Sequence, residues 1–155
     1  MTTDVAIRKG DRGDRAFVLD LGKRVAATSL SNVRPAPLAQ VETAYERLVA
    51  FIEGRESELL IASDGETDIG FLILLGDLPD EVTMLEQAFI AYMAVEPSAR
   101  GRGVGRALLL AAEDIARENG LPYLTLMVTE DNAAARTLYA ASGFTTERRM
   151  MTKAL

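Results

Sequence analysis

The chain has 155 residues, 48% of them hydrophobic, and a formal net charge of −6 at pH 7. This length is typical of one domain with a substantial core, so we expect a single domain over residues 1–155. This net charge disfavours nucleic-acid binding, which usually needs a basic face. There is no apolar run of the ~20 residues that a membrane helix requires, and no signal-peptide pattern at the start. We therefore expect a cytoplasmic globular protein without nucleic-acid or membrane partners, acting as a monomer or a homodimer.

The sequence contains no cysteine and no histidine. This excludes a thiolate nucleophile, a disulfide, a Ser-His-Asp triad and the usual zinc ligands. Any chemistry must use carboxylates, amines, phenols, hydroxyls and backbone groups. We therefore expect a reactive cosubstrate and no metal.

The first half of the chain predicts a strand, two helices and two strands, over residues 5–8, 17–25, 41–52, 58–63 and 67–75. The second helix is clearly amphipathic, because its apolar residues recur at i, i+3, i+4, i+7, i+8 and i+11 from Val41. Gly54 ends it. Asp64-Gly65 between the last two strands is a strong hairpin signal.

The second half predicts a strand, a helix, a strand, a helix and a closing strand, over residues 88–95, 104–118, 123–128, 132–142 and 145–152. The first of these helices has one apolar stripe from Val104 to Ile115, and Asn119-Gly120 ends it. The whole order is β-α-α-β-β-β-α-β-α-β. It predicts a mixed α/β fold, antiparallel early, with at least one right-handed βαβ crossover later.

The seam between the strand at 88–95 and the following helix reads A-R-G-R-G-V-G-R, residues 99–106. A helix N-terminus has unpaired N–H groups and the positive end of the helix dipole, and glycines let the backbone come close to a phosphate. The alternative is a glycine-rich turn whose arginines are only solvated. The dinucleotide fingerprint and the P-loop are both absent, because their spacings fail here. What remains is R-x-x-G-x-G, from Arg100 to Gly105.

In this setting the sequence resembles the GNAT superfamily of acyl-CoA-dependent N-acetyltransferases, whose pyrophosphate motif is [QR]-x-x-G-x-[GA]. The stretch N-A-A-A-R-T-L-Y-A-A-S-G-F, from Asn132 to Phe144, is similar to the second pattern of the family. The resemblance is specific from about Ala88 to Phe144 and only topological before it. It implies an α/β (α+β) fold with a mixed, mostly antiparallel central sheet of six to seven strands, flanked by about four helices.

The resemblance implies acetyl-CoA or a similar acyl-CoA as the cosubstrate. Its pantetheine arm would pair like an extra strand with the backbone of Met93, Ala94 and Val95, and Asn132 would contact the arm or the thioester. Tyr139 would lie near the sulfur. The pyrophosphate would rest on the seam, contacting Arg100, Gly101, Arg102, Gly103, Val104, Gly105 and Arg106.

The mechanism that the resemblance implies is direct attack of a neutral amine on the thioester. A backbone amide of Met93 or Ala94 would stabilise the oxyanion, and the Tyr139 phenol would protonate the leaving thiolate. The base that takes the amine's proton is less evident, because residues 88–95 contain no carboxylate. Glu86 is the nearest candidate, Asp80 and Glu81 are more remote, and water alone is the alternative.

Two functions remain at this point. The first is an N-acetyltransferase that acts on a primary amine of a small molecule or peptide. The second is a non-catalytic acyl-CoA-binding sensor domain, because the strand carboxylate is missing. The resemblance assigns the amine site to residues 17–52 and 76–86, whose acidic side chains suit a cationic amine but also suit solvent. The acceptor itself cannot be derived from them.

Overall fold

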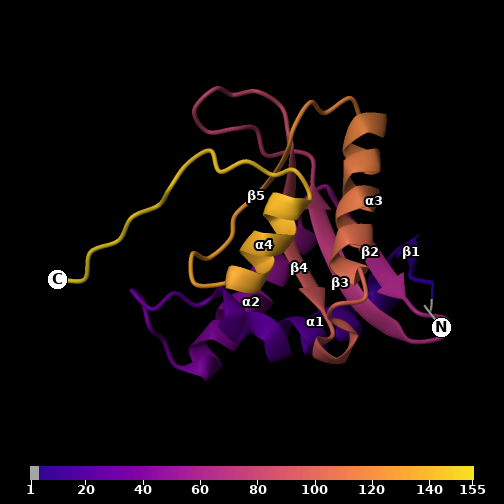
Figure 1. Ribbon diagram of the computed structural model, residues 1–155, viewed down its shortest axis with the longest axis horizontal. Helices are drawn as coiled ribbons and strands as arrows, with labels where there is room; N and C mark the ends of the chain where they lie inside the picture. Colours follow the sequence, from indigo (N-terminus) through magenta and orange to yellow (C-terminus); the bar gives the residue numbers. More distant parts are fainter. Residues whose placement is uncertain (1–3) are drawn as a thin grey trace.

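The computed structural model describes residues 4–155 (Figure 1). The first three residues, which begin the segment analysed for a signal peptide, lie outside the described part. The sheet contains β1 (Ala6–Lys9), β2 (Ser57–Ser63), β3 (Asp68–Leu75), β4 (Ala88–Val95) and β5 (Leu124–Leu126). The α-helices are α1 (Arg15–Val25), α2 (Leu38–Glu53), α3 (Val104–Glu118) and α4 (Ala133–Ala141), with short 3-10 turns at Arg12–Asp14, Ala26–Ser29 and Pro97–Ala99.

The five strands lie in the order of the chain, β1-β2-β3-β4-β5. The first three pairings are antiparallel, and β4 pairs with β5 in parallel across α3. The predicted hairpin between β2 and β3 is confirmed, since Gly65 has a φ of +110° and the Asp64 amide donates to the Thr67 carbonyl at 3.1 Å. The sequence pattern therefore predicts most of the topology.

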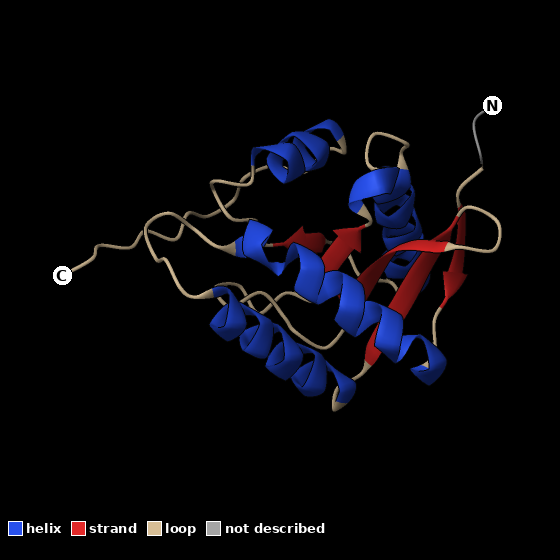
Figure 2. Cartoon of the chain, turned by 90° about the horizontal axis from the view of Figure 1, so that it is seen from below, coloured by secondary structure: helices blue, strands red, loops and turns tan. Residues whose placement is uncertain are grey.

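The helices cover the two faces of the sheet, and each face has its own buried cluster (Figure 2). The apolar stripe of α3 packs on one face, where Leu108 is fully buried. On the other face α1 and α2 pack around Phe71 of β3 and Tyr45 of α2. Because β3 and β4 contribute to both clusters, β4 is held firmly between the layers.

The predicted closing strand over residues 145–152 is wrong, and the sheet has five strands where six to seven were expected. Residues 145–155, here called the tail, are exposed throughout and extend away from the body (Figure 1). The reason is physical: a strand forms only where a neighbouring backbone accepts its hydrogen bonds. The tail is held elsewhere, because the Arg148 guanidinium bonds to Asp80 at 2.7 and 3.1 Å.

Within residues 4–155, every helix is too short or too polar to cross a membrane.

Candidate cofactor and active site

The glycine seam forms a left-handed turn before α3. Gly101 and Gly103 have φ angles of +77° and +78°, which side chains rarely adopt, so glycine is needed at both positions. A Cβ on either residue would meet no protein atom within 4 Å, so the turn faces open space. Gly103 is the N-cap of α3, and no side chain caps the helix there. The first amides of α3 are therefore available to an anion.

The three arginines of the seam are exposed beside this turn. Arg102 lies 3.2 Å from the Asp64 carboxylate on the β2–β3 turn, which orients it across the strands. The structure brings Arg100, Arg102 and Arg106 together with the uncapped end of α3. Positive side chains and free amides at one place favour a phosphate or pyrophosphate.

The second half of β4 has an open edge. β4 pairs with β5 only from Ala88 to Ile90, opposite Leu124 to Leu126. Beyond this point Met93, Ala94 and Val95 pair with β3 on one side only. Backbone N–H and C=O groups on such an edge can accept another extended chain. The edge leads directly into the turn before α3, so one elongated ligand can contact both.

Three elements meet at Gly105, which lies in the first turn of α3. A Cβ on Gly105 would come within 2.8 Å of Cδ2 of Leu138 on α4 and 3.7 Å of Cε of Met93 on β4. A side chain at position 105 would therefore require the Leu138 side chain to shift. The contact sets α4 directly beside the start of α3.

Tyr139 on α4 is half-buried, and its ring lies 5.8 Å from that of Phe144. Burial, and then the neighbouring Tyr92 of β4, raise the pKa of the Tyr139 hydroxyl above its usual range. The phenol therefore keeps its proton at neutral pH. This is the state that a general acid needs.

Asn132 is the N-cap of α4. Its Oδ1 accepts a hydrogen bond from the Ala135 amide at 3.3 Å, as the helix-start pattern predicts. That bond uses the carbonyl oxygen and leaves the amide NH2 to donate to a ligand.

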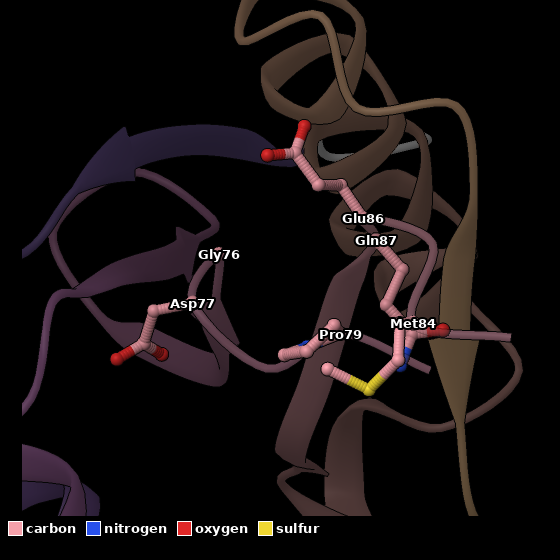
Figure 3. A pocket seen from close by; sticks show the side chains of 6 residues that line it. All are labelled: Gly76, Asp77, Pro79, Met84, Glu86 and Gln87. Carbon is pink, nitrogen blue, oxygen red and sulfur yellow. The ribbon is translucent and has the colours of Figure 1, made fainter. Parts of the chain in front are cut away.

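The carboxylates near β4 include the candidate base expected from the sequence, Glu86, and a second group that directly follows the strand. Glu86 is exposed in the loop before β4 and lies six residues before Tyr92, about 20 Å along an extended chain. It lines a hollow of about 260 Å³ at the start of β4, and its side chain points away from Met84 and Pro79 (Figure 3). Glu86 therefore lies before the start of β4, at the opposite end of the strand from Met93, Ala94 and Val95.

Glu96, which the sequence reasoning missed, is the carboxylate that directly follows β4. Both of its oxygens accept hydrogen bonds from the Arg24 guanidinium, at 2.9 and 2.5 Å. Arg24 lowers the pKa of the Glu96 carboxyl, so this group is held ionised and occupied. The Asp80 carboxylate also has partners, since it accepts hydrogen bonds from Arg148 and Thr83. These bonds lower its pKa. The position of Glu96 directly after β4 could have indicated it as a candidate base. Its pairing with Arg24, 72 residues away in the sequence, could not be predicted.

An aromatic group lies on the other side of β4, facing α1 and α2. The rings of Tyr92 and Tyr45 are 4.8 Å apart, and the Tyr45 hydroxyl donates to the Val18 carbonyl at 2.7 Å. Sequence reasoning also missed Tyr92, although its alternation along β4 could have indicated it.

The loop between α1 and α2 contacts the segment that leads into α4. Thr129 Oγ1 donates to the Ser29 carbonyl at 2.7 Å, and the Asn32 amide donates to Asp131 Oδ2 at 2.8 Å. These bonds place residues 29–32 beside the segment that leads into α4. A molecule at the open edge of β4 would thus be bordered by residues from both halves of the chain.

Residues 17–144 match the Acetyltransferase (GNAT) family. The chain belongs to this family. The fold of this GNAT protein is also seen in a putative acetyl transferase from Pyrococcus furiosus, with a TM-score of 0.83, 24% identity, and coverage of 98% of this chain and 100% of the other. An aminoglycoside N-acetyltransferase in complex with CoA shares the fold at a TM-score of 0.69 and 18% identity, with 97% and 98% covered.

Two curated relatives match over shorter stretches. The uncharacterized N-acetyltransferase YhfO of Bacillus subtilis is 38% identical over 97 residues, 63% of this chain and 64% of that protein. A mycothiol acetyltransferase of Beutenbergia cavernae is 48% identical over 56 residues, 36% of this chain and 19% of that protein. The matches thus cover less than two thirds of either relative.

A metal was not expected from the sequence. Among the described residues, no three acidic side chains are grouped so as to hold one.

Proposed function

We propose that this protein is an N-acetyltransferase that moves an acetyl group from acetyl-CoA to a primary amine of a small molecule or peptide. The observation that carries the proposal is the continuity between the open edge of β4 and the uncapped start of α3. An extended amide-containing arm suits the first, and a pyrophosphate suits the second. Acetyl-CoA has both groups in this order.

Different residues of the chain bind different parts of acetyl-CoA. Amides from Gly101 to Arg106 bind the pyrophosphate, while Arg100 and Arg106 add positive charge. Arg106 also lines a hollow of about 190 Å³ between α3 and α4, which suits the nucleotide end of the cosubstrate. Met93, Ala94 and Val95 bind the arm through their backbone, and Asn132 donates to it from α4.

Acetyl-CoA supplies an activated acyl group and a thiolate leaving group, and the protein orients the amine for direct attack. The amide of Met93 or Ala94 donates to the developing oxyanion. Tyr139 holds the proton that the sulfur receives. Without a cysteine there is no thiol to form a covalent acyl-enzyme, which favours a ternary complex.

We assign the amine's proton to water at the open edge of β4, in preference to Glu86. Glu86 lies at the far end of the strand, and Glu96 is fully engaged by Arg24. The acetylation rate should then be almost unchanged in Glu86→Gln. A loss of more than tenfold would show that Glu86 takes the proton.

The cosubstrate is tested by thermal unfolding. Acetyl-CoA at a hundredfold excess over its Kd should stabilise the folded chain by about 2.7 kcal/mol, which corresponds to a Tm rise of about 5–10 °C. NAD and ATP at the same concentrations serve as controls. A shift with NAD or ATP and none with acetyl-CoA would overturn the proposal.

The second candidate function is an acyl-CoA sensor without turnover. It is favoured by the composition of β4, because residues 88–95 contain no carboxylate and Glu96, which follows them, is bonded to Arg24. A pooled panel of amines, monitored for release of the CoA thiol, distinguishes the two. Acetyl-CoA binding without turnover on any amine would favour the sensor.

A further inference from the structure

Two partly buried carboxylates lie beside the glycine seam, and an arginine is bonded to each. Asp64 on the β2–β3 turn pairs with Arg102 of the seam itself. Glu96, which directly follows β4, pairs with Arg24 of α1, 72 residues earlier in the sequence. The side chains of Asp64 and Glu96 are each 22% exposed, so water and salt screen their charges only in part.

Glu96 is fixed at a short distance from the place where the pyrophosphate is proposed to lie. Its amide donates to the Ile69 carbonyl of β3 at 2.8 Å, and its carbonyl accepts from the Ala99 amide at 2.9 Å. One 3-10 turn, Pro97–Ala99, then leads into the seam. Such a turn rises about 2 Å per residue, so the backbone of Glu96 lies roughly 10 Å from Gly101. A charge on Glu96 therefore acts on a phosphate at the seam.

The sign of that interaction is unfavourable. Acetyl-CoA is the cosubstrate of the proposed function, on which this inference rests, and its pyrophosphate is negatively charged. An unpaired carboxylate at about 10 Å repels it, most strongly at low salt, where the Debye length exceeds this distance. An ionised Glu96 without a partner would thus weaken binding at the seam.

Arg24 is oriented to neutralise this charge. Its two terminal nitrogens donate to the two oxygens of Glu96 at 2.9 and 2.5 Å, a bidentate arrangement. Asp20, one helical turn earlier on α1, accepts from Arg24 Nε at 3.0 Å and helps to hold the side chain in place. Arg24 also lowers the pKa of the Glu96 carboxyl, so the carboxylate remains ionised beside its partner.

We propose that Arg24 is a positioning residue of the cosubstrate site, which acts through Glu96 by neutralising its charge beside the seam. Acetyl-CoA binding then depends on α1, a helix outside the seam. Neutralisation has a consequence that a purely structural tie lacks, because the two partners of one ion pair have opposite effects on binding. Loss of Arg24 leaves an unpaired negative charge, whereas loss of the charge on Glu96 leaves an unpaired positive one.

Calorimetric titration of acetyl-CoA into uncharged variants separates neutralisation from a structural tie. At about 20 mM salt, Arg24→Gln should raise the Kd by about five- to tenfold, because the repulsion is then little screened. Glu96→Gln should leave the Kd unchanged or lower it. The double variant Arg24→Gln/Glu96→Gln should return to within about twofold of the parent. Equal losses in the two single variants, or a double variant no better than Arg24→Gln, overturn the inference.

Arg15→Gln is the matched control. Arg15 is the first residue of α1, about 14 Å along the helix from Arg24, and its Nε bonds to Glu53 of α2 at 2.5 Å. This variant loses one ion pair of the same helix and the same unit of charge, yet that pair joins α1 to α2 and not to the seam. Its Kd for acetyl-CoA should stay within about twofold of the parent. A loss equal to that of Arg24→Gln overturns the inference.

Ionic strength provides a measurement that a structural role would not change. At about 0.5 M salt the Debye length falls to about 4 Å, so the difference in Kd between Arg24→Gln and the parent should shrink to less than about twofold. A difference that persists at this salt concentration indicates a lost contact and overturns the inference. A parent that binds no acetyl-CoA at either salt concentration overturns the proposed function as well, whereas the other outcomes leave the proposed function standing.

Discussion

The helices α3 and α4 meet at Gly105 and Leu138, but they are held in opposite ways. Seven residues of α3 are buried and none of α4. The N-terminus of α3 has no side-chain cap, whereas Asn132 caps that of α4. α3 is therefore a rigid part of the core that presents free amides, and α4 is a lightly packed helix that presents a phenol. Changes around α3 should affect binding or folding, and changes on α4 should affect the rate.

The largest effect is expected for Gly103→Val. A side chain there would occupy the open space where the pyrophosphate is proposed to lie. We expect acetyl-CoA affinity to fall at least ~10³-fold, about 4 kcal/mol, measured by calorimetric titration.

Gly120→Val is the matched control, because Gly120 has a φ of +69° and the same open surroundings at the other end of α3. Both variants carry a backbone strain of roughly 1–2 kcal/mol, and only Gly103→Val should lose the ligand. Equal affinities in the two variants would show that the glycines of the seam serve only the turn.

The next prediction compares the packing of α3 and α4 by making a leucine-to-alanine substitution in each helix. Leu108→Ala removes a fully buried side chain of α3 and should lower the free energy of unfolding by about 3 kcal/mol. Leu138→Ala on α4 removes a half-buried one and should lower it by about 1 kcal/mol. Urea unfolding of both variants measures the difference. Similar losses would contradict the contrast between the helices.

Tyr139→Phe should reduce kcat by ~10²-fold, about 2.7 kcal/mol of barrier, with acetyl-CoA affinity nearly unchanged. The ring still packs against Phe144, so only the proton donor is lost. Because burial raises the pKa of Tyr139, activity of the parent should also not decline up to pH 9 through loss of this proton.

The control is Tyr123→Phe, which removes an exposed hydroxyl next to β5 and should be silent. Steady-state kinetics on an amine identified by the panel provides the measurement. If the Phe variant at 139 stays within about twofold of the parent in kcat, Tyr139 is not the acid, provided that chemistry limits the parent.

The smallest effect is expected for Asn132→Ala. Loss of the cap on α4 should lower the free energy of unfolding by about 1 kcal/mol, a Tm decrease of about 2–4 °C. If Asn132 also donates to the cosubstrate, KM for acetyl-CoA rises as well, while Asn132→Asp restores the cap alone. An unchanged KM in both variants would show that Asn132 only caps α4 and does not contact the cosubstrate.

The same contrast explains how far the sequence can predict this molecule. The motif around α3 is local, so the turn, the glycines and the helix boundaries follow from adjacent residues. The tail at 145–152 has strand-forming residues, yet a strand also needs an edge to pair with, and that partner is not encoded in the segment itself. For the same reason the Arg24–Glu96 pair, which removes a carboxylate from the chemistry, joins residues too distant in sequence to be predicted from spacing.

The close approach of Gly105 to Leu138 limits the order in which this protein can change during evolution. A methyl group at position 105 would lie within 2.8 Å of the Leu138 side chain, so the two positions compete for one volume. Gly105→Ala should therefore force the Leu138 side chain to shift, and its cost in stability should be smaller once Leu138 has become smaller. Among descendants of this chain, a larger residue at 105 should appear more often together with a smaller one at 138.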